Sequence, residues 1–212
     1  MSDITKKQII TWLTNCSDVY SENRDLLTEL DAAIGDADHG LNMDRGFGEV
    51  ATKLPSVVDN DIASVFKTTG MSLLSKVGGA SGPLYGTFFI RAATKSAGKE
   101  SLNLVEFVDA LQAGVDGVVG RGKAEPGDKT MCDVWWDVIA TAKASVEAGE
   151  DTKVALADMA LVAESAVEKT IPMQAKKGRA SYLGERSIGH ADPGATSTKL
   201  MIQALNKVVN EA

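Results

Sequence analysis

The sequence predicts an all-α fold, with about eight amphipathic helices joined by loops. Apolar residues recur every three or four positions along most of the 212 residues, which is the spacing of one face of an α-helix. No stretch shows the alternation of apolar and polar residues that is typical of strands. No linker, change of composition or internal repeat divides the chain, so we expect a single helical domain over residues 1–212.

The first half of the chain is expected to hold four of these helices. The first covers residues 5–30, with an apolar stripe of Ile9, Leu13, Cys16 and Tyr20. A second helix over residues 40–53 ends before Pro55, because the residue before a proline disfavours helical geometry. Residues 59–61 offer N-caps for the third helix, and the fourth follows a glycine-rich turn at residues 78–83.

The second half shows the same pattern, with one long interruption. Asn103 and Glu106 have the spacing of a capping box at the start of a helix. Residues 171–194 are expected to form a long loop, and such loops in a compact domain are more often functional than structural. The remaining helices are expected over residues 104–119, 131–146, 152–170 and 195–209.

The composition limits the possible partners. Hydrophobic residues make up 44% of the chain, charged residues 24%, and the net charge of −7 argues against a nucleic-acid surface. No apolar run approaches the roughly 20 residues of a membrane span, and no secretion signal follows the N-terminus. Cys16 and Cys132 lie far apart and lack metal spacing. We therefore expect a reduced, cytoplasmic protein that binds neither nucleic acid nor membrane.

Three carboxylates fall within one short turn. They are Asp31, Asp36 and Asp38, and Gly35 and Gly40 enclose the last two. Bringing three anions together costs free energy unless cations compensate. Hard oxygen ligands suit Mg²⁺, which takes few carboxylates and fills its other positions with phosphate and water. This stretch therefore predicts a Mg²⁺–phosphate site.

The same residues also fit a simpler interpretation. Asp and Gly are common in turns, and Asp favours helix N-caps, so three acids taken alone are more often solvated caps than metal ligands. A helical bundle with acidic turns therefore stays open as an alternative. An EF-hand is not expected, because Leu41 stands where the turn glycine of that motif belongs.

Further polar loops with glycine lead into helices at residues 78–83, 120–130 and 184–194. A glycine-rich turn that opens a helix exposes N–H groups that bind phosphate. With the aspartate turn, these loops are candidates for one functional end of the bundle. The chain has no Walker A, dinucleotide, HExxH or GxSxG motif. Single loop residues such as His39, His190, Arg179 and Arg186 are as well explained by structural roles as by functional ones.

Taken together, the loop sequences resemble those of a known family. They are GDADHG (35–40), GGASGPLYG (78–86), RGKAEPGDKTM (121–131), GRASYLGERS (178–187) and DPGA (192–195). The sequence is similar to the nucleotide-binding subunits of bacterial dihydroxyacetone kinases that depend on the phosphoenolpyruvate phosphotransferase system. The matching stretches span almost the whole chain, and the separate domain that binds dihydroxyacetone in ATP-dependent relatives has no counterpart in it.

This resemblance implies an eight-helix antiparallel barrel with ADP at one rim. Asp31, Asp36 and Asp38 match the family's metal ligands and would hold two Mg²⁺ ions. The nucleotide would lie along His39, Gly40, Leu41, Asn42, Ala80, Ser81, Gly122, Met131, Arg179, Asp192, Pro193 and Gly194. Among these residues, Ala80 and Ser81 would meet phosphate, whereas Gly122 and Met131 would border the adenosine.

The resemblance also implies the activity and the partners. Tightly bound ADP would accept a phosphoryl group from a phosphohistidine on one partner subunit and pass it to dihydroxyacetone on a second one. Because phosphoryl transfer needs positioning and charge neutralisation above all, the lack of an evident nucleophile agrees with this role. The alternative from the same likeness is a non-catalytic nucleotide-binding sensor that reports to a transcriptional regulator. The sequence leaves open whether the chain forms a homodimer.

Overall fold

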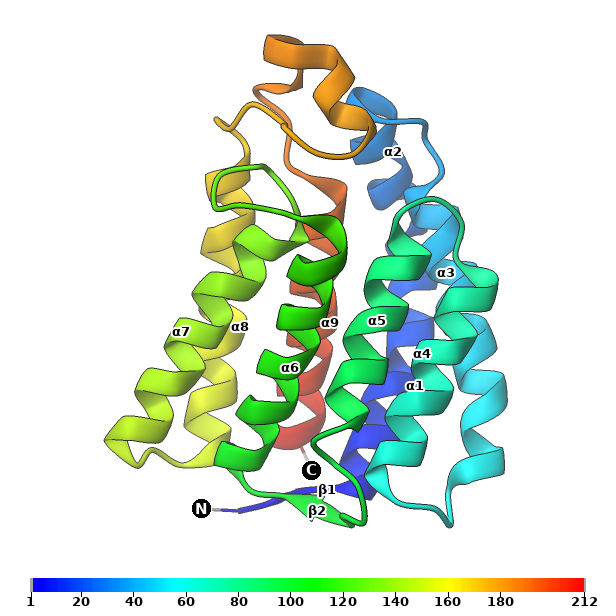
Figure 1. Cartoon of the computed structure of the whole chain (residues 1–212), viewed down its shortest axis with the longest axis vertical. Coiled ribbons are helices and arrows are strands. Elements are labelled where there is room, and N and C mark those ends of the chain that lie inside the picture. The colour runs from blue at the N-terminus through cyan, green and yellow to red at the C-terminus, as the bar shows by residue number, and fades with distance from the viewer. Residues whose placement is uncertain (1, 212) are drawn as a thin grey trace.

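Helices make up most of the molecule, as the sequence predicts (Figure 1). The computed structural model describes residues 2–211. Two short 3₁₀ segments, η1 (Leu54–Val57) and η2 (Arg179–Ser187), and two short strands, β1 (Ile4–Thr5) and β2 (Ser101–Leu102), accompany the helices. The helices are α1 (Lys6–Glu22), α2 (Arg24–Ile34), α3 (His39–Lys53), α4 (Ile62–Lys76), α5 (Ser81–Ala93), α6 (Leu104–Gly122), α7 (Met131–Ala148), α8 (Thr152–Thr170) and α9 (Pro193–Asn210).

Successive helices pack side by side and run in alternating directions. From α3 to α9 each helix contacts the next one along the chain, and α1 contacts both α3 and α9. The first and last long helices of the chain are therefore neighbours (Figure 1). Because the directions alternate, the connections before α3, α5, α7 and α9 all reach the same end of the molecule, at the top of Figure 1.

The contact between α1 and α9 is held by aromatic side chains with polar tips. Trp12 Nε1 donates a hydrogen bond of 2.8 Å to the carbonyl of Met201, and the Tyr20 hydroxyl donates one of 2.8 Å to the carbonyl of Ser197. Both rings are buried, where aromatic side chains with a satisfied polar group are favoured. These two bonds join residues far apart in the sequence.

Several helix boundaries agree with their sequence signals. The capping box of Asn103 and Glu106 is present at the start of α6, with Glu106 N donating to Asn103 Oδ1 at 3.0 Å. Asp61 caps α4 by accepting from Ser64 N at 2.9 Å. The α8 helix covers the expected residues 152–170. The expected loop 171–194 is less irregular than predicted, because it contains η2.

One predicted element is corrected. The helix expected over residues 5–30 is broken at Asn23, which ends α1 and precedes α2. Asn23 Nδ2 donates to the carbonyl of Val19 at 2.8 Å, so its side chain satisfies a backbone acceptor at the end of α1. The break turns α2 away from α1 and brings Asp31 to the end of the molecule where the loops meet (Figure 1).

Two further expectations concern the cysteines and membrane-spanning helices. Cys16 and Cys132 are both buried and unpaired, in agreement with the absence of a disulfide framework. Within residues 2–211, no helix combines the length and the apolar character that crossing a bilayer requires.

Candidate functional site

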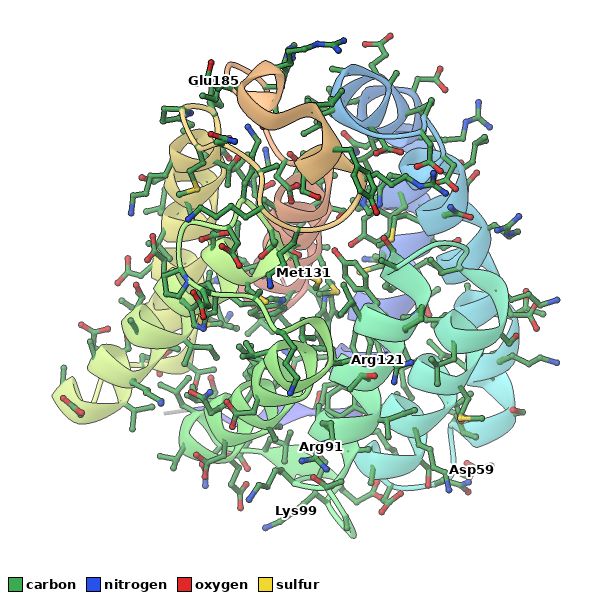
Figure 2. The ribbon with its side chains drawn as sticks, turned by 45° about the horizontal axis from the view of Figure 1, so that its top comes forward. Asp59, Arg91, Lys99, Arg121, Met131 and Glu185 are labelled. Carbon is green, nitrogen blue, oxygen red and sulfur yellow. The ribbon has the colours of Figure 1, made fainter. Side chains whose placement is uncertain are left out.

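A pocket of about 420 Å³ opens at the end of the molecule where the loops meet. Five regions line it: the turn of residues 31–39 (the aspartate turn), residues 78–85, the connection from α6 to α7 with the adjoining helix ends, parts of residues 171–192 (the rim segment), and the start of α9. Figure 2 tilts this end forward and shows Met131, at the start of α7, near the centre of the view. The loops that the sequence singled out therefore meet at one pocket.

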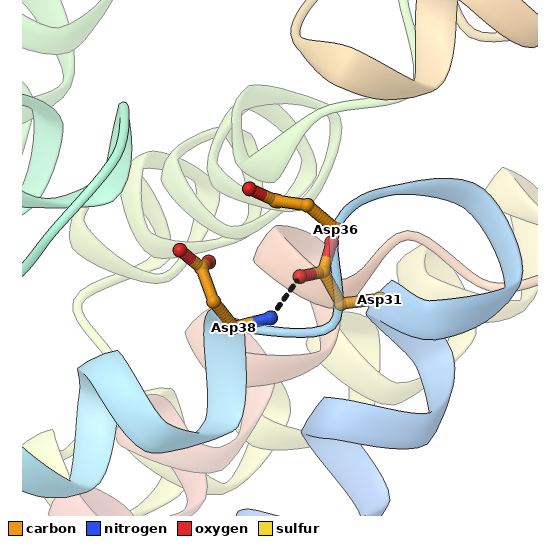
Figure 3. A group of neighbouring side chains, drawn as sticks. All are labelled: Asp31, Asp36 and Asp38. Carbon is orange, nitrogen blue, oxygen red and sulfur yellow. Dashed lines mark hydrogen bonds between the residues drawn. The ribbon is translucent and has the colours of Figure 1, made fainter.

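The three carboxylates of the aspartate turn lie together. One oxygen from each of Asp31, Asp36 and Asp38 lies within 4.8 Å of the other two. Asp31 is buried, and its Oδ2 accepts hydrogen bonds from the backbone N–H groups of Asp38 at 2.8 Å and His39 at 3.1 Å. The carboxyl groups of Asp36 and Asp38 project on the same side of the turn (Figure 3). Asp31 thus fixes the backbone at the start of α3, while the carboxyl groups of Asp36 and Asp38 face the pocket.

The backbone of the aspartate turn requires a glycine at position 35. A Cβ atom at Gly35 would lie 2.0 Å from Asp31 Oδ1, so no other residue fits there without moving that carboxylate. Ala37 has a φ of 60°, in the left-handed region that costs a non-glycine residue free energy. This tight turn folds the chain back over Asp31 and brings the later carboxylates close to the first.

His39 lies under the carboxylates, between three helices. Its Nε2 is 2.8 Å from Ser197 Oγ on α9, and its Nδ1 is 3.1 Å from Ser81 Oγ on α5. Burial lowers the pKa of His39, although Asp31 and Asp38 oppose that change. A neutral imidazole with one donor and one acceptor nitrogen satisfies both serines. The histidine therefore joins the aspartate turn to the start of α5.

The glycine-rich loop of residues 78–83 presents a helix N-terminus to the pocket. Ala80 precedes α5, and its side chain cannot cap the free N–H groups of the first turn. Such a helix start favours anions through its N–H groups and its dipole. Asn42 supports the loop, because its Oδ1 accepts from Gly78 N at 3.1 Å and from Arg45 Nη2 at 2.6 Å.

The opposite side of the pocket combines apolar and basic groups. Leu84, Val118 and Met131 supply apolar surface, whereas the positively charged lining residues are Arg121, Lys129, Lys177 and Arg179. Arg179 Nε lies 2.8 Å from Asp36 Oδ2, so the rim segment reaches across to the aspartate turn. Cations beside a carboxylate cluster and an open helix N-terminus suit a ligand with both a metal ion and phosphate groups.

Asp192 closes the site at the start of α9. It is buried, its Oδ2 accepts from Ala195 N at 2.7 Å, and burial raises its pKa to about 7. The nearby ammonium of Lys129 opposes this rise. Pro193 and Gly194 follow in the first turn of α9 and also line the pocket.

Comparisons with known proteins identify the fold. The family model described as "DAK2 domain" matches residues 33–207. The chain belongs to the DAK2 domain family. It is 56% identical to the ADP-binding subunit of the PEP-dependent dihydroxyacetone kinase of Escherichia coli K12, over 98% of this chain and 99% of that protein. It is 44% identical to the corresponding subunit of kinase 1 of Listeria innocua, over 94% of this chain and 95% of that one.

A solved structure agrees with the helical arrangement. The dihydroxyacetone kinase of C. freundii, crystallised with AMP-PNP and Mg²⁺, superimposes with a TM-score of 0.71 and 24% identity. The match covers 98% of this chain but 35% of the C. freundii chain, so this DAK2 domain corresponds to about a third of the larger enzyme.

Most of the predicted site residues of this DAK2 domain line the pocket. Three of them do not: Gly40 packs against α2, Leu41 is exposed, and Asn42 supports the glycine-rich loop. The pocket lining also excludes Arg186 and His190. The lining residues predicted from the sequence are Asp31, Asp36, Asp38, His39, Ala80, Ser81, Gly122, Met131, Arg179, Asp192, Pro193 and Gly194.

Sequence reasoning missed Lys129 as a separate feature of the site. The polar loop of residues 120–130 is a candidate from its sequence, but the sequence does not distinguish this lysine from its polar neighbours. In the structure its side chain is buried and lines the pocket. No local signal distinguishes it, because its contacts are with residues more than 40 positions away in the chain.

Proposed function

We propose that this chain is the ADP-binding subunit of a PEP-dependent dihydroxyacetone kinase. The observation that carries the proposal is the cluster of Asp31, Asp36 and Asp38 beside the uncapped start of α5, in one pocket. When bound there, ADP with Mg²⁺ accepts a phosphoryl group from a phosphohistidine and passes it to dihydroxyacetone. The close similarity to the E. coli subunit over nearly its full length supports the same role.

The three aspartates fit Mg²⁺ by their chemistry. Their oxygen atoms lie within 4.8 Å of one another, and hard oxygen ligands are those that Mg²⁺ prefers. Asp36 and Asp38 offer carboxylates to the pocket, whereas Asp31 uses Oδ2 for backbone amides and keeps Oδ1 for a metal. We propose that these residues hold two Mg²⁺ ions, which would offset the negative charge of the phosphate groups.

The remaining lining residues are proposed to hold the nucleotide. Ala80 and Ser81 offer the start of α5 to a phosphate group, and Arg179 adds a positive charge from the rim segment. Gly122 and Met131 border the side where an adenosine would lie. Of the other proposed nucleotide-binding residues, His39, Asp192, Pro193 and Gly194 line the pocket, whereas Gly40, Leu41 and Asn42 lie outside its lining.

The chain needs partners for the complete reaction. Its residues would position the phosphate groups and neutralise their charge, whereas the groups that activate the sugar would lie on a partner. We propose a dihydroxyacetone-binding subunit and a phosphohistidine-carrying phosphotransferase subunit as partners in the cytoplasm. A transcriptional regulator or a second copy of the chain are further partners to test by co-purification.

The proposal includes the architecture. Residues 1–212 form one domain, in which α1 and α3–α9 make an eight-helix antiparallel barrel and α2 is an addition at the rim. The closed series of helix neighbours supports this arrangement. An experimental structure in which α1 and α9 are apart would contradict it.

A transfer experiment tests the function. The purified chain is loaded with ADP and Mg²⁺ and mixed with the phosphorylated phosphotransferase subunit; bound ATP is then measured by rapid quench. We expect ATP to form, and to yield dihydroxyacetone phosphate once the substrate-binding subunit is added. Asp36→Ala serves as the inactive control. Bound ADP that is never converted would favour the sensor function, and a wild-type chain that binds no ADP would contradict both.

A further inference from the structure

Lys129 is a buried lysine whose ammonium group meets only backbone oxygens. Its side chain is 1% exposed, and Nζ donates to the carbonyls of Ser187 at 2.7 Å, Met173 at 3.0 Å and Ile171 at 3.4 Å. An ammonium group has three N–H donors, and all three are used. Within residues 2–211 no Asp or Glu forms an ion pair with it. A buried ammonium group with three such hydrogen bonds stabilises the backbone segments that carry the three carbonyls.

The three carbonyls belong to both ends of the rim segment. Ile171 follows α8 and Met173 lies just after it, whereas Ser187 is the last residue of η2. Lys129 therefore ties together two points of the rim segment that enclose Arg179. Figure 1 shows this segment, in gold and orange, crossing the top of the molecule. Other hydrogen bonds also join these two parts of the segment: Gly189 N donates to the carbonyl of Ile171 at 2.8 Å, and Ala175 N donates to Ser187 Oγ at 2.9 Å.

The backbone of Lys129 supports a fixed role. Its φ is 62°, in the left-handed region that non-glycine residues rarely adopt. Such a conformation persists where surrounding contacts hold it in place. Thr130 caps α7 immediately after it, so the lysine is anchored to a rigid helix start. The side chain thus extends from a fixed point into the rim segment.

We propose that Lys129 is a positioning residue that holds the rim segment closed over the pocket and thereby slows the release of ADP. This inference rests on the proposed nucleotide-binding function. Lys129 acts through the segment that carries Arg179 and Asp192. The tether accounts for a bound nucleotide that serves as a cofactor and stays on the protein between transfers.

The test measures ADP dissociation from the full-length chain in the presence of Mg²⁺. Lys129→Met keeps the side-chain length and removes the charge; we expect release to be about tenfold faster or more, the factor for losing a hydrogen bond to a charged group. Lys99→Met, at the opposite end of the molecule, is the matched control and leaves the rate unchanged. A folded Lys129→Met variant that releases ADP at the wild-type rate would overturn the proposal, even if its melting temperature falls.

Amine rescue separates positioning from a general structural role. In Lys129→Ala, added ethylammonium can donate to the three carbonyls, whereas tetramethylammonium carries the same charge and has no N–H group. We expect ethylammonium alone to slow ADP release again. Equal effects of the two amines, or none, would count against the hydrogen-bonded tether.

Two further measurements keep the inference testable if other parts fail. Should Lys129→Met not fold, Ser187→Ala loosens the same segment without changing a buried charge, and it must also speed ADP release. Trypsin cleavage after Lys176, Lys177 and Arg179 needs no nucleotide and must be faster in the Lys129 variants than in wild type. If wild type binds no ADP, the proposed function fails, and the trypsin result alone decides whether the tether exists.

Discussion

The acidic side of the pocket comes from one continuous stretch, residues 31–39, whereas the basic side is assembled from separate parts of the chain. In the aspartate turn, the decisive hydrogen bonds join Asp31 to backbone groups seven and eight residues later. On the basic side, Lys129 contacts carbonyls that are 42, 44 and 58 residues away. The acidic side is therefore fixed mainly by local geometry, and the basic side depends on the tertiary fold.

Replacing the exposed carboxylates is the strongest way to break the acidic side. Asp36→Ala or Asp38→Ala removes a proposed metal ligand, so ADP affinity should fall at least about 100-fold. Losing a group that only supports a metal ligand already weakens a metal site by about 10- to 100-fold, and losing a ligand itself should cost at least as much. Isothermal titration with ADP and Mg²⁺ measures it. Chelation of Mg²⁺ from wild type should release ADP to the same extent, and retained ADP in both variants would contradict the shared metal site.

The second prediction concerns pH and Asp192, the buried carboxyl group at the start of α9. Burial raises the pKa of Asp192 to about 7 in the folded protein, well above the usual aspartate value of about 3.9. The folded state therefore holds a proton that the unfolded state has lost, and the stability from this group declines as the pH rises from about 4 through 7. Between pH 5 and 7 the loss is about 2 kcal/mol, at about 1.4 kcal/mol per pKa unit.

The comparison with Asp192→Asn isolates this effect. Asn keeps an oxygen for the N–H of Ala195 but does not titrate, so the variant lacks this part of the pH dependence. Urea unfolding without nucleotide or metal, at pH 5, 6, 7 and 8, gives the difference in unfolding free energy. It should widen in favour of the variant up to about pH 7 and then stay constant. A constant difference across the range would show that Asp192 is ionised throughout.

The third prediction distinguishes the members of the acidic side. Asp31→Ala leaves the N–H groups of Asp38 and His39 without their acceptor, so the metal-free protein should lose about 1.5 kcal/mol of stability, within the range for helix caps. Asp38→Ala is the control, because its carboxylate accepts no hydrogen bond from residues 2–211. Equal losses in the two variants would contradict the capping role of Asp31.

The sequence anticipated the local side of this comparison better than the tertiary one. The capping signals of Asn103 and Asp61 act over three residues, and both were predicted. Asp31 accepts the two backbone hydrogen bonds through Oδ2, which leaves Oδ1 for the proposed metal ion, so a structural role and a metal-binding role of this residue are compatible. The break at Asn23 was not predicted, because the apolar spacing continues across it to Leu27.

The buried position of Lys129 could not be predicted from its polar loop. Its burial depends on the rim segment, which folds over it from more than 40 residues away. Similarly, Gly40, Leu41 and Asn42 were expected along the nucleotide because the family resemblance implies it. Helical geometry turns them to different sides of α3, and only the structure shows which side meets the pocket.

The smallest expected effect concerns the ion pair between Arg179 Nε and Asp36 Oδ2, 2.8 Å apart, which joins the two sides of the pocket. The arginine side chain is 69% exposed, and exposed pairs contribute little to stability. Arg179→Ala should therefore change the unfolding free energy of the nucleotide-free protein by no more than about 0.5 kcal/mol, while it weakens ADP binding. Arg186→Ala, in the same segment but outside the pocket lining, is the control for both measurements. If Arg179→Ala destabilised the nucleotide-free protein and left ADP affinity unchanged, the ion pair would stabilise the fold. Arg179 would then not contribute to nucleotide binding.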